Sequence, residues 1–178
     1  MKLTNKYFLC YNINSTEGGM ILMAIKISED NFFSVINDEI LSLSWKNRFD
    51  AIDINDEEEA IFDIILNETR EIIGKISFDY FFKSGFSYSG NVGYNIKYRF
   101  QNKHYATRAL KLLRTLLLSN KYSGDKSLYL ATKIDNIRSQ KVILNNNGNL
   151  IYDGKVPINE PLNFMEGVKK VKVYKIDM

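Results

Sequence analysis

The spacing of apolar residues changes abruptly in the middle of the chain, and this change constrains the fold most. From Val92 to Tyr98 every second residue is apolar, which is typical of a half-buried strand. From Lys103 to Ser119 apolar residues recur at every third or fourth position, which predicts an amphipathic helix. A strand that leads through a short polar loop into such a helix needs a sheet with the helix packed on it. We therefore expect an α/β fold rather than an all-helical or all-strand one.

The segments on both sides of this junction predict further strands. Upstream, residues 60–66 and 71–82 are rich in β-forming residues and are separated by a polar turn. Downstream we expect strands at 127–133, 150–152 and 168–176, the last of them near an edge of the sheet. Between the first two we expect a helix from 137 to about 146, which ends at Asn147 and Gly148 in the left-handed conformation. The expected architecture is a single domain, 1–178, with a mixed, mostly antiparallel central sheet of about six or seven strands flanked by helices.

The first quarter of the chain gives weaker signals. Residues 7–14 and 20–28 predict two strands joined by a glycine-containing turn. A helix capped by Ser28 or Asp30 is then indicated by apolar residues at spacings near three and four: Phe32, Phe33, Ile36, Ile40 and Leu43.

Composition excludes several classes of protein. The chain has 178 residues, of which 45% are apolar and 25% charged, as in ordinary globular domains. One cysteine and one histidine rule out an internal disulfide and a Cys- or His-based metal site, so we expect no metal. No apolar run approaches the roughly 18 residues of a membrane-spanning helix or the core of a signal peptide. We therefore expect a cytoplasmic protein without a membrane partner.

Positive charge is concentrated in one window. The net charge is only +3, yet residues 80–124 contain no Asp or Glu. The same window holds eight basic residues: Lys83, Lys97, Arg99, Lys103, Arg108, Lys111, Arg114 and Lys121. Such a segment suits a polyanionic ligand, and it equally suits a solvated helix face.

The loop before the central helix has the features of a phosphate site. The first N–H groups of a helix have no backbone partner, and the helix dipole is positive there. Lys103 adds positive charge, Gln101 adds hydrogen-bond donors, and the small side chain of Ala106 lets a ligand approach the backbone. The junction therefore predicts an anion-binding cradle.

Two blocks of sequence resemble the GCN5-related N-acetyltransferases (GNATs). The family's acyl-CoA loop, Gln/Arg-x-x-Gly-x-Gly/Ala, corresponds to the stretch from Gln101 to Ala106. The family's Asn-x-x-Ser/Ala helix corresponds to Asn136 and Ser139, followed by Asn147 and Gly148. Residues 90–96 resemble the strand that pairs with pantetheine, and the resemblance as a whole covers about residues 72–153.

The resemblance implies an acetyl-CoA-dependent transfer of an acetyl group to a primary amine, either a small molecule or a protein N-terminus. It implies that Asn136 contacts the pantetheine arm and that Ser139 lies near the sulfur as a candidate proton donor to the thiolate. The implied acetyl-CoA-binding residues are Ile96, Tyr98, Gln101, Asn102, Lys103, His104, Tyr105, Ala106, Thr107, Asn136 and Ser139. Whether the protein forms a homodimer is left open by the sequence.

Three positions depart from the family pattern. His104 replaces the middle glycine of the loop, Ile143 stands where many members carry a proton-donating tyrosine, and Arg108 replaces a common acidic residue. No general base is therefore assigned. Two alternatives remain: a catalytically degenerate GNAT-like module that binds CoA, and a nucleic-acid-binding module. The second ranks last because the basic helix lacks interleaved aromatic residues and the total charge is small.

Several reactive side chains have a structural interpretation. We expect Tyr94, Tyr98 and Tyr105 to pack rather than to donate protons. His104 belongs to the loop that contacts diphosphate, which is far from an acyl carbon, so we do not assign it as a base. Structural roles are also expected for Asp79, Tyr80 and Cys10, and a solvated surface for the acidic block at residues 56–59.

Overall fold

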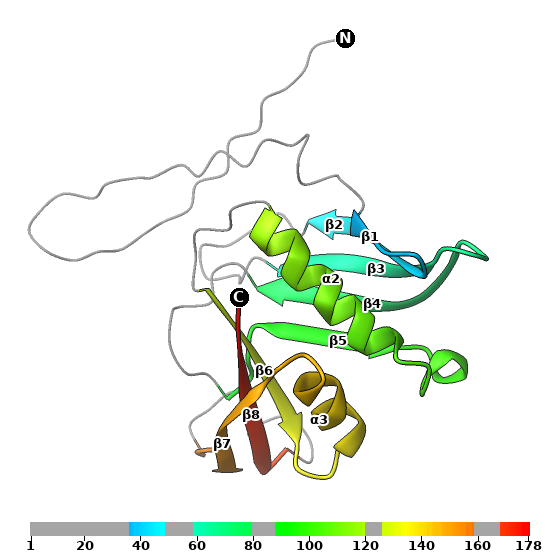
Figure 1. The fold of residues 1–178 in the computed structure, drawn as a ribbon. Coiled ribbons are helices and arrows are strands. Elements are labelled where there is room, and N and C mark those ends of the chain that lie inside the picture. The colour runs from blue at the N-terminus through cyan, green and yellow to red at the C-terminus, as the bar shows by residue number, and fades with distance from the viewer. Residues whose placement is uncertain (1–35, 49–58, 80–87, 120–125, 159–167) are drawn as a thin grey trace, which may run out of the picture. The chain divides into compact units, whose positions relative to one another are not determined.

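The computed structural model describes residues 36–48, 59–79, 88–119, 126–158 and 168–178, all within one compact unit, Val35–Met178 (Figure 1). The strands expected at 7–14 and 20–28 lie outside the described residues, as do Cys10, Tyr80 and most of the acidic block.

The first five strands form one antiparallel sheet in chain order. They are β1 (Ile36–Asn37), β2 (Leu41–Arg48), β3 (Glu59–Leu66), β4 (Glu71–Asp79) and β5 (Val92–Ile96). The strands expected at 60–66 and 92–98 are thus present, although β5 ends early because a short 3₁₀ helix, η1 (Tyr98–Phe100), follows it. The strand expected at 71–82 is present up to Asp79, and its last three residues lie outside the described ones.

The last three strands form a second antiparallel sheet with the order β6-β8-β7. They are β6 (Ser127–Lys133), β7 (Asn149–Lys155) and β8 (Lys170–Asp177). The α-helices of the described residues are α2 (Tyr105–Ser119) and α3 (Ile137–Leu144), both where the sequence predicts them. Asn147 has a φ of 63°, as expected for the left-handed helix end. The fold is α/β with antiparallel pairing, and its eight described strands form two sheets rather than one.

The helix expected up to Leu43 is wrong. The described part of that segment forms β1 and β2, joined by a turn in which the Asp38 carboxylate accepts hydrogen bonds from the amides of Ile40 (2.8 Å) and Leu41 (2.7 Å). An aspartate that satisfies amides two and three residues ahead reverses the chain and competes with helix formation. Leu41 and Leu43 are then two residues apart on a strand, and both are buried.

The edge position expected for the last strand is also wrong. β8 lies between β6 and β7 and pairs with both of them. Its alternation of lysines with Val171 and Val173 arises because one face of the strand is covered while the other is solvated.

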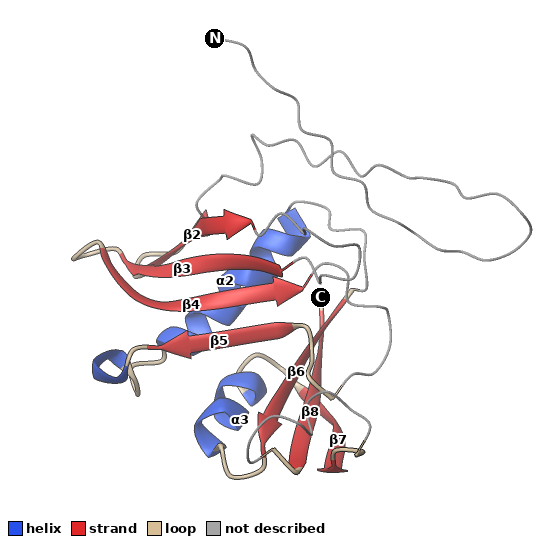
Figure 2. Ribbon diagram, turned by 180° about the vertical axis from the view of Figure 1, so that it is seen from behind, coloured by secondary structure: helices blue, strands red, loops and turns tan. Residues whose placement is uncertain are grey.

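Helix α2 covers one face of the five-stranded sheet, in front of it in Figure 1 and behind it in Figure 2. Leucines of its apolar stripe are buried together with Leu43, Phe62 and Ile76 from successive strands. Gly74 permits the close pairing of β4 with β5, because a Cβ at this position would lie 2.2 Å from the Asn95 carbonyl oxygen. Within the described residues, no helix is long and apolar enough to span a membrane.

Asn91 joins the two sheets. Its amide donates to the Tyr129 carbonyl (2.9 Å), and its side-chain Oδ1 accepts from the Tyr129 amide (2.8 Å). Its own carbonyl accepts from the Asp79 amide (3.0 Å), so this buried residue connects the end of β4 to β6. Beyond this point β5 and β6 diverge (Figures 1 and 2).

We predict that Asn91→Ala lowers the free energy of unfolding by about 1–3 kcal/mol, because it leaves the buried Tyr129 amide without an acceptor. The matched control is Asn149→Ala at the exposed start of β7, which should change it by less than about 0.5 kcal/mol. Urea denaturation of the three proteins measures both values. Equal stability of the two variants would contradict the joining role of Asn91.

Candidate active site

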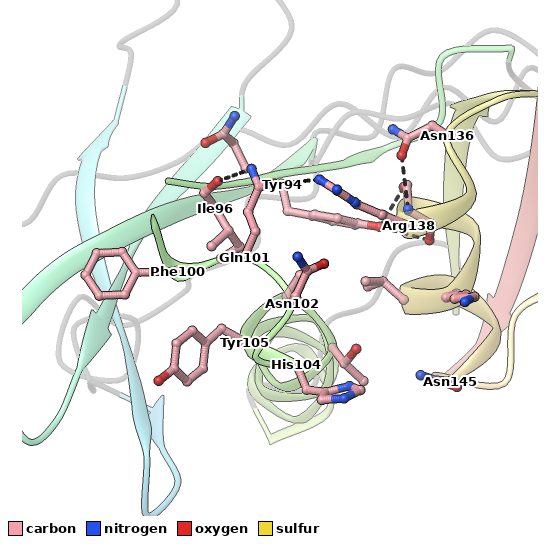
Figure 3. Close-up of a pocket in the computed structure, with 16 residues that line it drawn as sticks. Tyr94, Ile96, Phe100, Gln101, Asn102, His104, Tyr105, Asn136, Arg138 and Asn145 are labelled. Carbon is pink, nitrogen blue, oxygen red and sulfur yellow. Dashed lines mark hydrogen bonds between the residues drawn. The ribbon is translucent and has the colours of Figure 1, made fainter. Parts of the chain in front are cut away.

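A cavity of about 640 Å³ lies between the diverging part of β5, the loop before α2 and the first turns of α3 (Figure 3). Its lining residues are Tyr94, Asn95, Ile96, Phe100, Gln101, Asn102, His104, Tyr105, Ala106, Thr107, Asn136, Arg138, Ser139, Lys141, Val142 and Asn145. A cavity of this volume accommodates a cofactor-sized ligand.

The N-terminus of α2 opens into this cavity. The first helical hydrogen bond runs from the Arg108 amide to the His104 carbonyl (3.1 Å), so the amides of residues 105–107 have no partner inside the helix. The preceding loop reaches this position through left-handed φ angles at Asn102 (62°) and His104 (60°). A β-carbon-bearing residue with such a φ is strained, and histidine thus occupies a position that suits glycine.

Helix α3 begins on the opposite side of the cavity. Asn136 is its N-cap, and the side-chain Oδ1 of this residue accepts a hydrogen bond from the Ser139 amide (3.1 Å). The cap leaves the amide NH₂ of Asn136 available to a ligand. Cap and helix together fix where Ser139 enters the cavity.

Gln101 connects the strand, the loop and α3 (Figure 3). Its Nε2 donates to the Ile96 carbonyl (3.0 Å), and its Oε1 accepts from Arg138 Nη1 (3.0 Å). One glutamine side chain therefore occupies both a backbone acceptor on β5 and a guanidinium group on α3.

The cavity favours anions. Arg138 and Lys141 lie three residues apart on α3 and line it, and no Asp or Glu is among its lining residues. Arg108, one turn into α2, is instead paired with Asp38 (2.7 Å). Burial raises the pKa of Asp38, but hydrogen bonds from the Leu41 and Ile40 amides and the Arg108 guanidinium outweigh it, so the pKa lies below its ordinary value. In the described part of the chain, no group of three or more His, Cys, Asp or Glu side chains is arranged to hold a metal.

Two hydroxyl groups meet inside the cavity. Tyr94 Oη lies 2.7 Å from Ser139 Oγ and 3.3 Å from the Ser139 carbonyl oxygen. Burial raises the pKa of Tyr94 to about 12, although the hydrogen bond with Ser139 acts in the opposite direction. The phenol is therefore protonated at neutral pH.

Most of the residues that the sequence indicated lie around this one cavity, from Ile96 to Thr107 and from Asn136 to Ser139. Tyr98 and Lys103 lie outside it. Tyr98, which we expected to pack, is 87% exposed, and the Lys103 ammonium lies 6.0 Å from the Phe100 ring centroid. Ile143 is fully buried, so a proton donor is absent at that position of α3.

Sequence reasoning missed Tyr94 and Arg138. Tyr94 follows the alternation of β5, so its spacing indicated packing, and its contact with Ser139 depends on how α3 meets the strand. Arg138 and Lys141 carried a usable signal: two cations at i and i+3 on a short helix share one face.

Comparison with known proteins identifies a matching family. A model described as an acetyltransferase (GNAT) domain matches residues 34–147. No curated protein matches the chain.

The solved structures that share the fold include the following three. A Vibrio cholerae protein assigned as a ribosomal-protein-serine acetyltransferase superposes with a TM-score of 0.54 at 15% identity, over 81% of this chain and 97% of that one. Ribosomal-protein-S5-alanine acetyltransferase from Vibrio fischeri gives 0.52 at 18% identity, over 67% and 61%. Mycobacterium smegmatis RimJ in complex with CoA-disulfide gives 0.50 at 16% identity, over 67% and 53%. This chain spans less than two thirds of the length of the last two.

The matched region of the family model includes the loop before α2, the N-terminus of that helix and all of α3. It covers more than half of the chain, and the α/β fold agrees with it. The chain therefore belongs to the GNAT family of acetyltransferases.

Proposed function

We propose that this protein transfers the acetyl group of acetyl-CoA to a primary amine. The observation that carries the proposal is the cavity in which the N-terminus of α2, two cations of α3 and the Tyr94–Ser139 hydroxyl pair face one space. One end of it suits phosphates, and the other offers a hydroxyl proton where a thiolate would form.

The diphosphate of acetyl-CoA fits the α2 end. Three amides of the first helical turn point outward, and the helix dipole adds positive potential there. Arg138 and Lys141 supply the charge that the sequence suggested for Lys103. An arginine also binds phosphate through two parallel hydrogen bonds, which a lysine does not.

The pantetheine arm fits along β5. The Lys97 amide bonds to the Ile73 carbonyl on β4, so residues 93, 95 and 97 direct their backbone groups toward β4. Because backbone groups alternate along a strand, Tyr94 and Ile96 direct theirs to the other edge. That edge borders the cavity, and the Ile96 carbonyl there already accepts a hydrogen bond from Gln101.

The proposed reaction is a direct nucleophilic attack of the amine on the thioester. The amine nitrogen attacks the thioester carbonyl carbon, a backbone N–H of β5 stabilises the oxyanion, and the carbon–sulfur bond breaks. Ser139 donates its hydroxyl proton to the departing sulfur. The amine loses its proton to water, since no carboxylate is among the residues that line the cavity. Most of the rate enhancement then comes from positioning.

The names of two relatives point to an acceptor class. The structures that share this fold include acetyltransferases of ribosomal protein S5 alanine and of ribosomal L7/L12 α-amino groups. A protein N-terminus is therefore the first acceptor to test, with small amines second. The alternative is a CoA-binding module without turnover, which the buried Ile143 and the missing base favour.

Thiol release from acetyl-CoA tests the function. We predict that free CoA appears when the protein is incubated with peptides bearing Ser or Ala N-termini, or with a panel of primary amines. Binding of CoA by calorimetry without thiol release for any acceptor would support the binding module. Absence of CoA binding at millimolar concentration would reject both functions.

Acetyl-pantetheine, which lacks the diphosphate, separates phosphate binding by Arg138 from pantetheine binding by Asn136. Arg138→Gln should raise the KM for acetyl-CoA by roughly 10-fold, a loss typical of one charged hydrogen bond, and leave the KM for acetyl-pantetheine unchanged. Asn136→Ser keeps a capping oxygen but removes the amide donor, so it should raise both KM values. Arg70→Gln, in the turn between β3 and β4, is the matched control and should change neither. Equal effects of Arg138→Gln on both substrates would rule out phosphate binding by Arg138.

The His104 position gives a further prediction. Glycine relieves the left-handed strain but costs chain entropy, so His104→Gly should be more stable than His104→Ala by about 0.5–1 kcal/mol. CoA affinity should be kept or increased in His104→Gly, because the backbone becomes more accessible to the diphosphate. Thermal denaturation and calorimetry measure the two effects. A large loss of affinity in both variants would instead make the His104 side chain a phosphate ligand.

A further inference from the structure

We propose that Tyr94 is a positioning residue that acts through Ser139, so that the two hydroxyls form a relay that delivers a proton to the sulfur of CoA. This inference rests on the proposed function. It assigns a chemical role to a tyrosine of the central strand whose spacing alone indicates packing.

The two hydroxyls are held by separate rigid elements. Tyr94 lies on β5, paired with Ile76 of β4, and Ser139 lies in the first turn of α3, where the Asn136 cap holds its amide. Their oxygens are 2.7 Å apart, the usual length of an O–H···O hydrogen bond. Neither side chain needs to move for the pair to form.

Hydrogen-bond geometry decides which hydroxyl donates once a sulfur is present. If Tyr94 donated to the Ser139 carbonyl, its bond would be the longer one of 3.3 Å. If it donates to Ser139 Oγ, the bond is 2.7 Å and the serine proton is released toward the cavity. An acceptor in the cavity therefore favours the second arrangement, in which each hydroxyl donates once.

The relay lowers the cost of protonating the sulfur. A lone serine that lost its proton would become an alkoxide, which is a far stronger base than a phenolate. In the relay the serine oxygen takes the phenol proton as it gives up its own, so the charge resides on the Tyr94 oxygen. Burial raises the pKa of Tyr94 to about 12, which is still far below that of an alcohol.

Atoms and charges balance in this step. The carbon–sulfur bond breaks and its electron pair goes to sulfur, the Ser139 proton goes to sulfur, and the Tyr94 proton goes to Ser139 Oγ. The tyrosinate regains a proton from water, which has taken up the proton that the amine releases. CoA leaves as a neutral thiol, and both hydroxyls are restored.

The first test needs no acceptor. Hydroxyl donation to a thiolate favours the charged form, so the pKa of CoA's thiol should be lower in the complex than in free solution. Thiolate absorbance is measured against pH for CoA bound to the wild type, Tyr94→Phe, Ser139→Ala and a control, Tyr152→Phe. The control removes a phenol bonded to the Lys155 carbonyl on β7, outside the cavity.

We expect the acid dissociation constant of the bound thiol to fall roughly 10-fold in Tyr94→Phe and in Ser139→Ala, and to stay unchanged in Tyr152→Phe. CoA affinity, measured by calorimetry below the thiol pKa, should change less than about twofold in Tyr94→Phe. An unchanged thiol pKa in Tyr94→Phe, with affinity retained, would overturn the relay and leave the proposed function intact.

The second test is a double-mutant cycle on thiol release with any accepted amine. Each single variant should lower kcat and kcat/KM together by roughly 10-fold with KM little changed, as expected for an interaction made only in the transition state. Tyr94→Phe should then have less than about a twofold effect in the Ser139→Ala background. Additive losses would mean that Tyr94 does not act through Ser139.

The two tests distinguish failure of the relay from failure of the proposed function. A wild-type protein that binds no CoA removes the proposed function and the relay together. A wild type that binds CoA with a lowered thiol pKa but releases no thiol rejects the transfer activity, while the pair is still judged by the Tyr94→Phe titration.

Discussion

The site depends on how Asn91 holds the start of β5 against β6. Its backbone and side chain bond to both the amide and the carbonyl of Tyr129, so the two strands are in contact at this residue and diverge beyond it. Buried polar groups need partners, and one asparagine supplies them where a regular ladder stops. Because the strands diverge, the backbone groups on the outer edge of β5 pair with no strand and border a cavity, with α3 across from them.

Local sequence signals predicted most of the fold. The change of spacing at residues 92–119 and the order of segments after it were sufficient for β5, α2, β6 and α3, because each has one solvated and one covered face. The helix expected up to Leu43 was wrong, since the apolar residues of this segment fit helical spacings of three and four while Leu41 and Leu43 also fit a strand, and the Asp38 turn decided between the two. The position of β8 failed because alternation reports which face is covered, and it does not report which strands lie beside it.

The candidate site was predictable where it is contiguous in sequence and unpredictable where it is assembled by packing. The loop before α2 was indicated by its own residues, and Asn136 and Ser139 were indicated by the resemblance to the family's helix motif. The Tyr94–Ser139 pair joins residues 45 positions apart, and nothing in either local pattern reports that distance. Lys103 shows the converse, since a charge in the right loop lies beside the Phe100 ring rather than in the cavity.

The Gln101 bridge means that the free protein already satisfies the groups that a ligand needs. Gln101 occupies one lone pair of the Ile96 carbonyl and one N–H of the Arg138 guanidinium, so its side chain competes with the acyl donor for those two hydrogen-bonding sites. The apparent affinity equals the intrinsic affinity multiplied by the fraction of molecules in which Gln101 has turned away. A ligand that engages both groups displaces the glutamine with one exchange of partners, whereas a ligand that engages one leaves the other hydrogen bond to be broken without compensation. The cavity thereby discriminates by hydrogen-bonding pattern: a ligand that carries a donor and an acceptor side by side, as an amide does, recovers the cost of displacing the glutamine, and a ligand with only one of them does not.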